Sequence, residues 1–127
     1  MRNNNPGNIR LSADKFRGEI PSKDTAFKQF STMEYGYRAL IVTLQTYQSK
    51  HGCGTIRKMI SRWAPDNENN TSAYMKHVSA STGYGLDEAI DMRKKDMAVK
   101  MARAISDVEN AGWHDTSAAM RGFDMIG

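Results

Sequence analysis

The first ten residues carry a high density of side chains that could bind a polar ligand. Four asparagines and two arginines stand within nine residues, around a Pro-Gly pair, in the segment Arg2-Asn3-Asn4-Asn5-Pro6-Gly7-Asn8-Ile9-Arg10. Asn carboxamides present paired donors and acceptors, and Pro-Gly favours a tight bend. The segment could therefore hold amides, with Asn5 and Asn8 on either side of the bend, in an array that reads sugar hydroxyls or N-acetyl groups. The alternative interpretation is an ordinary Asn-rich turn at a chain end.

Cleavage of a glycosidic bond needs a carboxylic acid that is still protonated near neutral pH. Among the 14 Asp and Glu residues, Glu109 stands apart because it closes a long apolar helix, expected over about 94–110. The negative end of a helix dipole does not stabilise a carboxylate, and the apolar neighbours Val108 and Trp113 add burial, so the protonated form is favoured. Glu109 is therefore the candidate general acid. The alternative is an exposed glutamate, because a like-sign helix end costs only a few tenths to about 1 kcal/mol.

A small sheet and a central helix are expected to position these groups. Three β-compatible stretches separated by turn residues, at 9–11, 16–20 and 27–30, predict a small irregular antiparallel sheet. Ser31 and Glu34 have the spacing of a capping box, which predicts a helix start and gives Glu34 a structural role. Apolar residues at three- and four-residue spacing continue this helix until Gly52 stops it; they are Tyr37, Leu40, Ile41, Leu44 and Tyr47.

Capping signals, glycines and a proline divide the second half of the chain into shorter helices. Pro65 disfavours helical geometry at Ala64 and so ends the first of them. Asn67 and Asn70 lie in the polar loop that follows, where they could contact a ligand, although N-capping explains Asn70 equally well. The expected helices begin at Thr55, at Asn70 or Thr71, at Asp87, at about Lys94, and at Asp115 or Thr116.

Aromatic side chains are the other candidates for ligand contact. Tyr35 and Tyr74 could line a cleft, offering a ring face to a sugar and a hydroxyl to a polar group. Tyr37 and Trp63 fit the core better by their spacing.

Length and composition describe one soluble globular domain over residues 1–127. This length suffices for a single core, and hydrophobic residues at 39% with charged residues at 25% are typical of such domains. No apolar run approaches the roughly 18 to 20 residues of a membrane span. The amino terminus lacks the apolar region of a secretory signal, so we expect no signal peptide.

The net charge of +4 favours polyanionic surroundings, which include nucleic acid and the bacterial cell wall. The basic residues are scattered, and the sequence lacks an RNA-binding signature, a Cys/His zinc spacing and a phosphate-cradling loop. We therefore expect no specific nucleic-acid partner, no metal and no cofactor. The lone Cys53 excludes an internal disulfide.

Four stretches of the chain resemble one family. The string NNNPGNIR, Asn3 to Arg10, resembles the opening of lysozyme-like proteins of phages and prophages, often labelled structural protein, which are thought to cut peptidoglycan. The other stretches resemble the same family in the same order and extend the match over nearly the whole chain; they are Phe27-Lys28-Gln29-Phe30 with Tyr35-Gly36-Tyr37-Arg38-Ala39, Arg62-Trp63-Ala64-Pro65 with Glu68-Asn69-Asn70-Thr71 and Tyr74, and Val108-Glu109-Asn110.

The resemblance implies an α+β, mainly α, lysozyme-like domain with a small N-terminal sheet. In lysozyme-like folds the Glu-bearing helix usually precedes the sheet, whereas Glu109 comes near the end of this chain, which implies a circular permutation that brings the opening Asn residues beside Glu109. The family has Glu-Asn-Gly at this position. This chain reads Glu109-Asn110-Ala111-Gly112, so the turn after the helix differs.

The implied activity is that of a peptidoglycan-degrading glycosidase, a muramidase or a lytic transglycosylase, with Glu109 as general acid. Glu19 and Asp24 are candidates for a second carboxylate, because the sheet faces the acid across the cleft in such folds. We prefer Glu19, since it follows Gly18 in a stretch resembling the family's. The alternative for Glu19 is a solvent-exposed strand carboxylate. A lytic transglycosylase needs no second carboxylate.

The implied partner is the glycan strand of the cell wall, bound by a monomer that is virion-associated or stays in the cytoplasm until release. The alternative function belongs to another class: a non-catalytic virion structural or wall-binding protein with the same fold.

Overall fold

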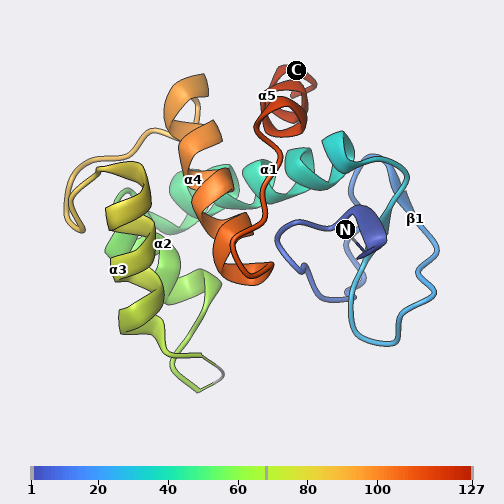
Figure 1. The fold of residues 1–127 in the computed structure, drawn as a ribbon, viewed down its shortest axis with the longest axis horizontal. Helices are drawn as coiled ribbons and strands as arrows, with labels where there is room; N and C mark the ends of the chain where they lie inside the picture. The colour runs from blue at the N-terminus through green and yellow to red at the C-terminus, as the bar shows by residue number, and fades with distance from the viewer. Residues whose placement is uncertain (1, 68, 127) are drawn as a thin grey trace.

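An irregular segment and a small sheet open the chain, and five helices follow, in a computed structural model that describes residues 2–67 and 69–126 (Figure 1). Glu68, from one of the resembling stretches, lies outside these residues. The described part is mainly helical with a small N-terminal sheet, as predicted. Its elements are the 3-10 helix η1 (Arg2–Asn4), β1 (Glu19–Ile20), β2 (Gln29–Phe30), α1 (Met33–His51), α2 (Ile56–Trp63), α3 (Thr71–Thr82), α4 (Lys95–Glu109) and α5 (Thr116–Asp124).

The sheet has two short antiparallel strands, with Glu19 opposite Phe30. An isolated bridge between Arg10 and Phe27 adds the third β-compatible stretch. All three predicted stretches therefore pair, but over fewer residues than expected.

Helix α1 runs across the molecule beneath α4 and α5 (Figure 1). Its N-cap is Thr32, whose hydroxyl accepts a hydrogen bond from the Tyr35 backbone N–H at 3.3 Å. The predicted capping box at Ser31 is therefore wrong by one residue. Glu34 instead pairs with Arg121 of α5 at 2.9 Å, which remains a structural role. Gly52 ends the helix in the left-handed conformation, with φ of 65°.

The other helix limits agree with the sequence except for one. Thr55, Asn70 and Asp115 cap α2, α3 and α5 through their side chains. The helix predicted at 87–91 is absent from the described residues because its polar groups have partners elsewhere. The Ile90 backbone N–H donates to the Gly54 carbonyl at 2.9 Å, and the Asp87 carboxylate pairs with Arg57.

Apolar side chains from all five helices form one buried cluster. At its centre Tyr37 is fully buried, and its hydroxyl donates to Ser106 Oγ at 3.0 Å and accepts from the Asp115 backbone N–H at 2.9 Å. These bonds tie α1 to α4 and to the start of α5. Met101 and Ile105 fill the inward face of α4 as predicted, so the helix that ends at Glu109 is fixed by core packing. Within 2–67 and 69–126, no helix has the length and apolarity needed to cross a membrane.

Candidate functional site

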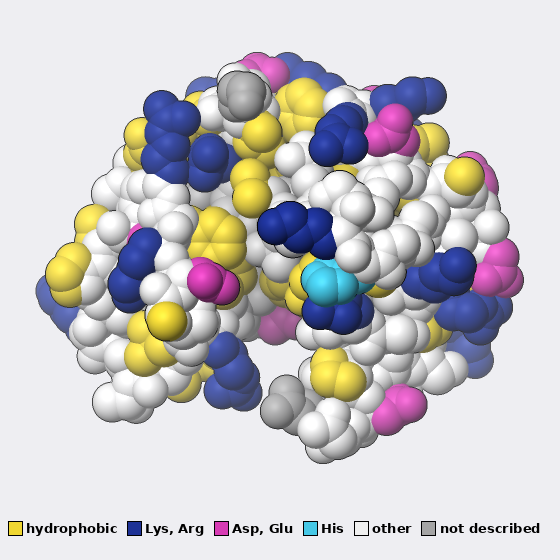
Figure 2. Space-filling model, turned by 180° about the vertical axis from the view of Figure 1, so that it is seen from behind, with side chains coloured by type: hydrophobic (Ala, Val, Ile, Leu, Met, Phe, Trp, Pro, Cys, Tyr) yellow, Lys and Arg dark blue, Asp and Glu magenta, His cyan; other side chains and the backbone are white. Residues whose placement is uncertain are grey.

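Glu109 is the last residue of α4 and lines three adjoining cavities of about 310, 430 and 500 Å³. The first two cavities share Asn8, Phe27 and Glu109, so they lie on either side of the same three side chains. Figure 2 shows the surface hollowed between the part formed by the N-terminal segment and the part formed by α2 and α3. An acidic side chain is visible in the hollow, with Lys and Arg side chains around it.

A short chain of hydrogen bonds fixes one oxygen of Glu109. The Tyr74 hydroxyl donates to Glu109 Oε2 at 2.8 Å, and Trp63 Nε1 donates to the same hydroxyl at 3.0 Å. Burial, then the charge of Glu109 and the hydrogen bond to it, raise the pKa of Tyr74. Tyr74 therefore keeps its proton and acts as a donor to the carboxylate.

The N-terminal segment fixes the other oxygen. Asn8 Nδ2 donates to Glu109 Oε1 and to the Glu109 backbone carbonyl, both at 3.1 Å. Asn110 Nδ2 donates back to the Pro6 carbonyl at 2.7 Å. The predicted packing of the opening Asn segment against the end of the Glu109 helix is therefore confirmed. The residue absent from the family pattern, Ala111, takes the left-handed conformation with φ of 53°.

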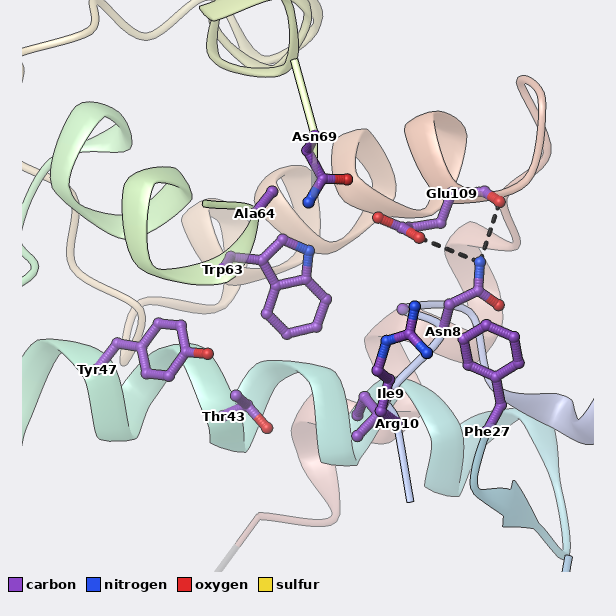
Figure 3. A pocket seen from close by; sticks show the side chains of 11 residues that line it. Asn8, Ile9, Arg10, Phe27, Thr43, Tyr47, Trp63, Ala64, Asn69 and Glu109 are labelled. Atoms are coloured by element: carbon purple, nitrogen blue, oxygen red, sulfur yellow. Dashed lines mark hydrogen bonds between the residues drawn. The ribbon is translucent and has the colours of Figure 1, made fainter. Parts of the chain in front are cut away.

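The first cavity combines aromatic rings, amides and a guanidinium (Figure 3). Trp63 and Asn69 face it from α2 and the loop after it, and Arg10 and Phe27 face it from the N-terminal segment and the sheet. The Arg10 guanidinium lies 5.3 Å from the centre of the Phe27 ring. Glu109 is the only Asp or Glu among the described residues that line the first two cavities. Ring faces, amides and a single carboxyl group are suited to holding a sugar and giving it a proton.

Asn5 lines the second cavity, and its side chain makes hydrogen bonds within the chain. Its side chain is 1% exposed; Nδ2 donates to the carbonyls of Ile9 and Lys28, and Oδ1 accepts from the Ile9 backbone N–H. The amide is thus used to hold the bend that presents Asn8. Gly36 permits this packing, because a Cβ there would lie 1.9 Å from the Asn4 carbonyl oxygen.

Of the four other residues predicted to bind the ligand, two line a cavity at Glu109 and two do not. Tyr74 and Asn70 line the third cavity, and Asn70 also caps α3 by accepting from the Ala73 backbone N–H at 3.1 Å. Asn67 is exposed and lines none of the described cavities. Tyr35 packs against Gly18, where a Cβ would come within 2.1 Å of its ring.

Glu19, the predicted second carboxylate, lies in a buried ion pair away from these cavities. Its side chain is 5% exposed, and both oxygens accept from Lys28 Nζ at 3.1 Å. Burial raises the pKa of Glu19, but the hydrogen bond from the Phe16 N–H and the hydrogen bond and charge of Lys28 outweigh it, so the net pKa is lowered. The alternative of a solvent-exposed strand carboxylate is wrong, because the Glu19 carboxylate is paired with the fully buried Lys28. The structure does not bring Glu19 and Glu109 together.

Sequence reasoning missed several lining residues. Trp63 was assigned to the core, yet its place at the last turn of α2 puts its ring at the cavity edge, where it reaches Tyr74. Asn69 lies in the same polar loop as Asn67 and Asn70, which were the predicted ligand contacts. The composition of the loop indicated that it could contact a ligand, but not which of its asparagines lines the first cavity. Arg10 and Phe27 could have been found only from their pairing across the sheet. Among the described residues no group of His, Cys, Asp and Glu could hold a metal ion.

Comparison with known proteins gives the family. No protein-family model matches the chain. Protein P5 of Pseudoalteromonas phage PM2 is 34% identical over 114 residues, which cover 87% of this chain and 69% of Protein P5. The chain therefore belongs to the family of phage proteins that includes Protein P5.

Proposed function

We propose that the protein cleaves the glycan strand of peptidoglycan for a phage or prophage, with Glu109 as general acid. The supporting observation is the setting of Glu109: a carboxyl group held by Tyr74 and Asn8, facing an open space lined by aromatic rings and amides. The opening segment at the end of α4 is also what a permuted lysozyme-like fold would require. We therefore also propose that the chain has a circularly permuted lysozyme-like fold.

In this mechanism the strand lies along the cavity with a sugar ring against Trp63 or Phe27, while Asn69 and Asn8 are within the same space to bind hydroxyl and N-acetyl groups. The protonated Glu109 gives its proton to the glycosidic oxygen as the bond to the anomeric carbon breaks. The donors Tyr74 and Asn8 keep the carboxyl group oriented toward the leaving oxygen, so they act as positioning residues.

The surroundings of Glu19 favour a transglycosylase over a hydrolase with two carboxylates. Glu19 is engaged by Lys28, and the first two cavities have no second Asp or Glu among their described lining residues. Asp107 lines the third cavity beside Glu109, but its carboxylate is paired with His114 at 2.7 Å. A transglycosylase needs no second carboxylate, because the attacking group belongs to the substrate itself. A hydroxyl of the same sugar closes on the anomeric carbon and gives its proton to the Glu109 carboxylate, which restores the acid and yields an anhydro sugar without consuming water.

A non-catalytic virion structural or wall-binding protein is the second candidate. Membership of a phage protein family fits this function at least as well as it fits an enzyme. The same cavity would then bind the strand without cleaving it. Both candidates imply association with the virion or delivery to the cell wall by other phage components.

Purified protein incubated with purified bacterial walls separates these candidates. Mass spectrometry of the soluble fragments identifies the reaction, since anhydro ends are lighter by one water than ordinary reducing ends. The transglycosylase proposal predicts anhydro ends as the main product. Reducing ends would instead indicate hydrolysis. Protein that sediments with the walls and releases no fragments would support the binding protein and contradict catalysis.

A further inference from the structure

We propose that a fourth cavity, next to the space at Glu109, binds carboxylate groups carried by the wall polymer, and that Arg17 and Arg38 are its anion-binding side chains. The inference rests on the proposed function for the identity of the polymer, but it holds equally for cleavage and for binding without cleavage.

The cavity has a volume of about 670 Å³ and lies between the loop before β1 and one face of α1. It shares Thr43 and Tyr47 with the first cavity at Glu109, so a polymer could extend from one into the other. Its charged lining residues are Asp14, Lys15, Arg17 and Arg38.

The charges of this cavity are not balanced. Three basic side chains line it against the single acidic residue Asp14. Lys15 is already paired with Glu19 at 3.4 Å. Arg17 and Arg38 therefore leave an excess of positive charge, which an anion between them would offset.

Arg38 supplies the second observation. Its Nε is buried and donates to no acceptor within the described part of the chain. A buried donor without an acceptor costs free energy, so such groups commonly mark the position of a missing partner. Burial lowers the pKa of Arg38, and the nearby charge of Arg17 lowers it further, so both arginines would gain from an anion between them.

A carboxylate fits these groups. A guanidinium binds a carboxylate with two parallel hydrogen bonds and releases its water more readily than an ammonium does. Peptidoglycan strands carry carboxylates close to the sugar chain, either on the lactyl ether of the muramic acid or in the peptide attached to it. Because the two cavities share Thr43 and Tyr47, a strand whose sugars lie in the first cavity has a carboxylate-bearing neighbouring sugar in the direction of the fourth.

The loop that carries Arg17 is held rigidly enough to form a binding wall. The buried Lys28 side chain donates to the Asp14 backbone carbonyl at 2.6 Å and to both oxygens of Glu19 at 3.1 Å. These bonds fix both ends of the short segment that contains Arg17. Less side-chain and loop freedom is then lost when an anion binds.

The test compares three oligosaccharide probes of equal sugar length by calorimetry: an N-acetylglucosamine oligomer without carboxylates, a wall strand stripped of peptide by an amidase, and a peptide-bearing strand. Binding is measured on the Glu109→Gln protein, so that no probe is cleaved. Arg17→Gln and Arg38→Gln are introduced into this background. Arg93→Gln, an exposed arginine of the loop before α4 that lines none of the described cavities, is the charge-matched control.

We expect the carboxylate-bearing strands to bind more tightly than the plain oligomer, and each cavity variant to weaken their binding by roughly tenfold. The plain oligomer should bind the variants and the parent within about twofold, and Arg93→Gln should behave as the parent. Tighter binding of the stripped strand points to the lactyl carboxylate, and a gain seen only with the peptide-bearing strand points to the peptide.

Two results would overturn the inference. One is equal affinity for all three probes; the other is a preference for carboxylates that survives in Arg17→Gln, which alters an exposed side chain and leaves the core untouched. A chain that does not act on peptidoglycan at all looks different, because none of the three probes would then bind; loss of cleavage alone would appear only in the wall digest and would leave this binding unchanged.

Discussion

The side-chain amide of Asn8 joins the N-terminal segment to the end of α4 by donating to both the backbone carbonyl and the Oε1 of Glu109, each at 3.1 Å. The two residues are 101 positions apart in the chain. A carboxyl group at a helix end would normally rotate freely in solvent. Here Asn8 on one side and Tyr74 on the other hold it in one orientation.

Removal of the Asn8 side chain should reduce activity more than stability. Asn8 has φ of 50°, so Asn8→Gly keeps the backbone conformation and removes only the amide. We expect wall lysis to fall by roughly 10- to 10²-fold through loss of orientation, measured as turbidity clearing. Asn8→Ala adds about 1 kcal/mol of backbone strain and should melt at a lower temperature than Asn8→Gly. Full lysis by Asn8→Gly would remove Asn8 from the mechanism.

Tyr74→Phe should weaken both the site and the fold. The substitution takes a donor from Glu109 Oε2 and leaves Trp63 Nε1 without its acceptor, which costs about 1–3 kcal/mol. Lysis should fall by roughly tenfold while substrate binding changes less, since the ring remains. Tyr84→Phe is the matched control, because the Tyr84 hydroxyl makes no hydrogen bond to the described residues. Equal losses in the two variants would argue that Tyr74 only packs.

Lys28→Met should destabilise the N-terminal part strongly. Lys28 is fully buried, and its loss leaves the nearly buried Glu19 carboxylate without its main partner, at a cost of about 3–5 kcal/mol. Chemical denaturation followed by circular dichroism gives the free energy of unfolding. Lys15→Met removes an exposed partner of the same carboxylate and should cost less than about 1 kcal/mol. Similar losses for both lysines would contradict the structural role of Lys28.

The free energy of unfolding should decrease at acidic pH because Glu19 becomes protonated and its ion pair with Lys28 is lost. Its pKa in the folded protein lies below the ordinary value of about 4.3, so the pair stabilises the fold above that pH and loses this contribution as pH drops through the lower, folded value. Glu19→Gln should therefore melt below wild type at pH 7, with the gap narrowing toward pH 3. Its lysis rate, measured well below the melting temperature, should stay near that of wild type. A loss of orders of magnitude would restore Glu19 as a catalytic carboxylate.

Much of the fold could be predicted because its signals are local. The caps at Thr55, Asn70 and Asp115 and the left-handed glycines at 52 and 83 act on neighbouring backbone, and the apolar spacing of α1 and α4 encodes their buried faces. The helix expected at 87–91 failed for the opposite reason. The competing partners are Gly54, 36 positions from Ile90, and Arg57, 30 positions from Asp87.

The candidate site could be predicted only in outline. Glu109 and Asn8 were both predicted as candidates from residue type and position, and the structure places their side chains in contact. Glu19 was predicted at the site, but the structure places it in an ion pair with the buried Lys28, and nothing next to Glu19 in the sequence indicates this partner. Trp63 was assigned by helical spacing alone, which cannot tell a core position from a cavity edge at the last turn of a helix.

The lysis rate of Glu109→Gln on purified walls tests the catalytic proposal most directly. Removal of the general acid should lower the rate by roughly 10²-fold or more, while circular dichroism and melting temperature stay close to wild type. The matched control is Asp96→Asn, because Asp96 is an exposed carboxylate in the first turn of the same helix. This variant should lyse walls at the wild-type rate. Wild-type lysis by a folded Glu109→Gln protein, or walls left intact by the wild-type protein itself, would contradict catalysis by Glu109.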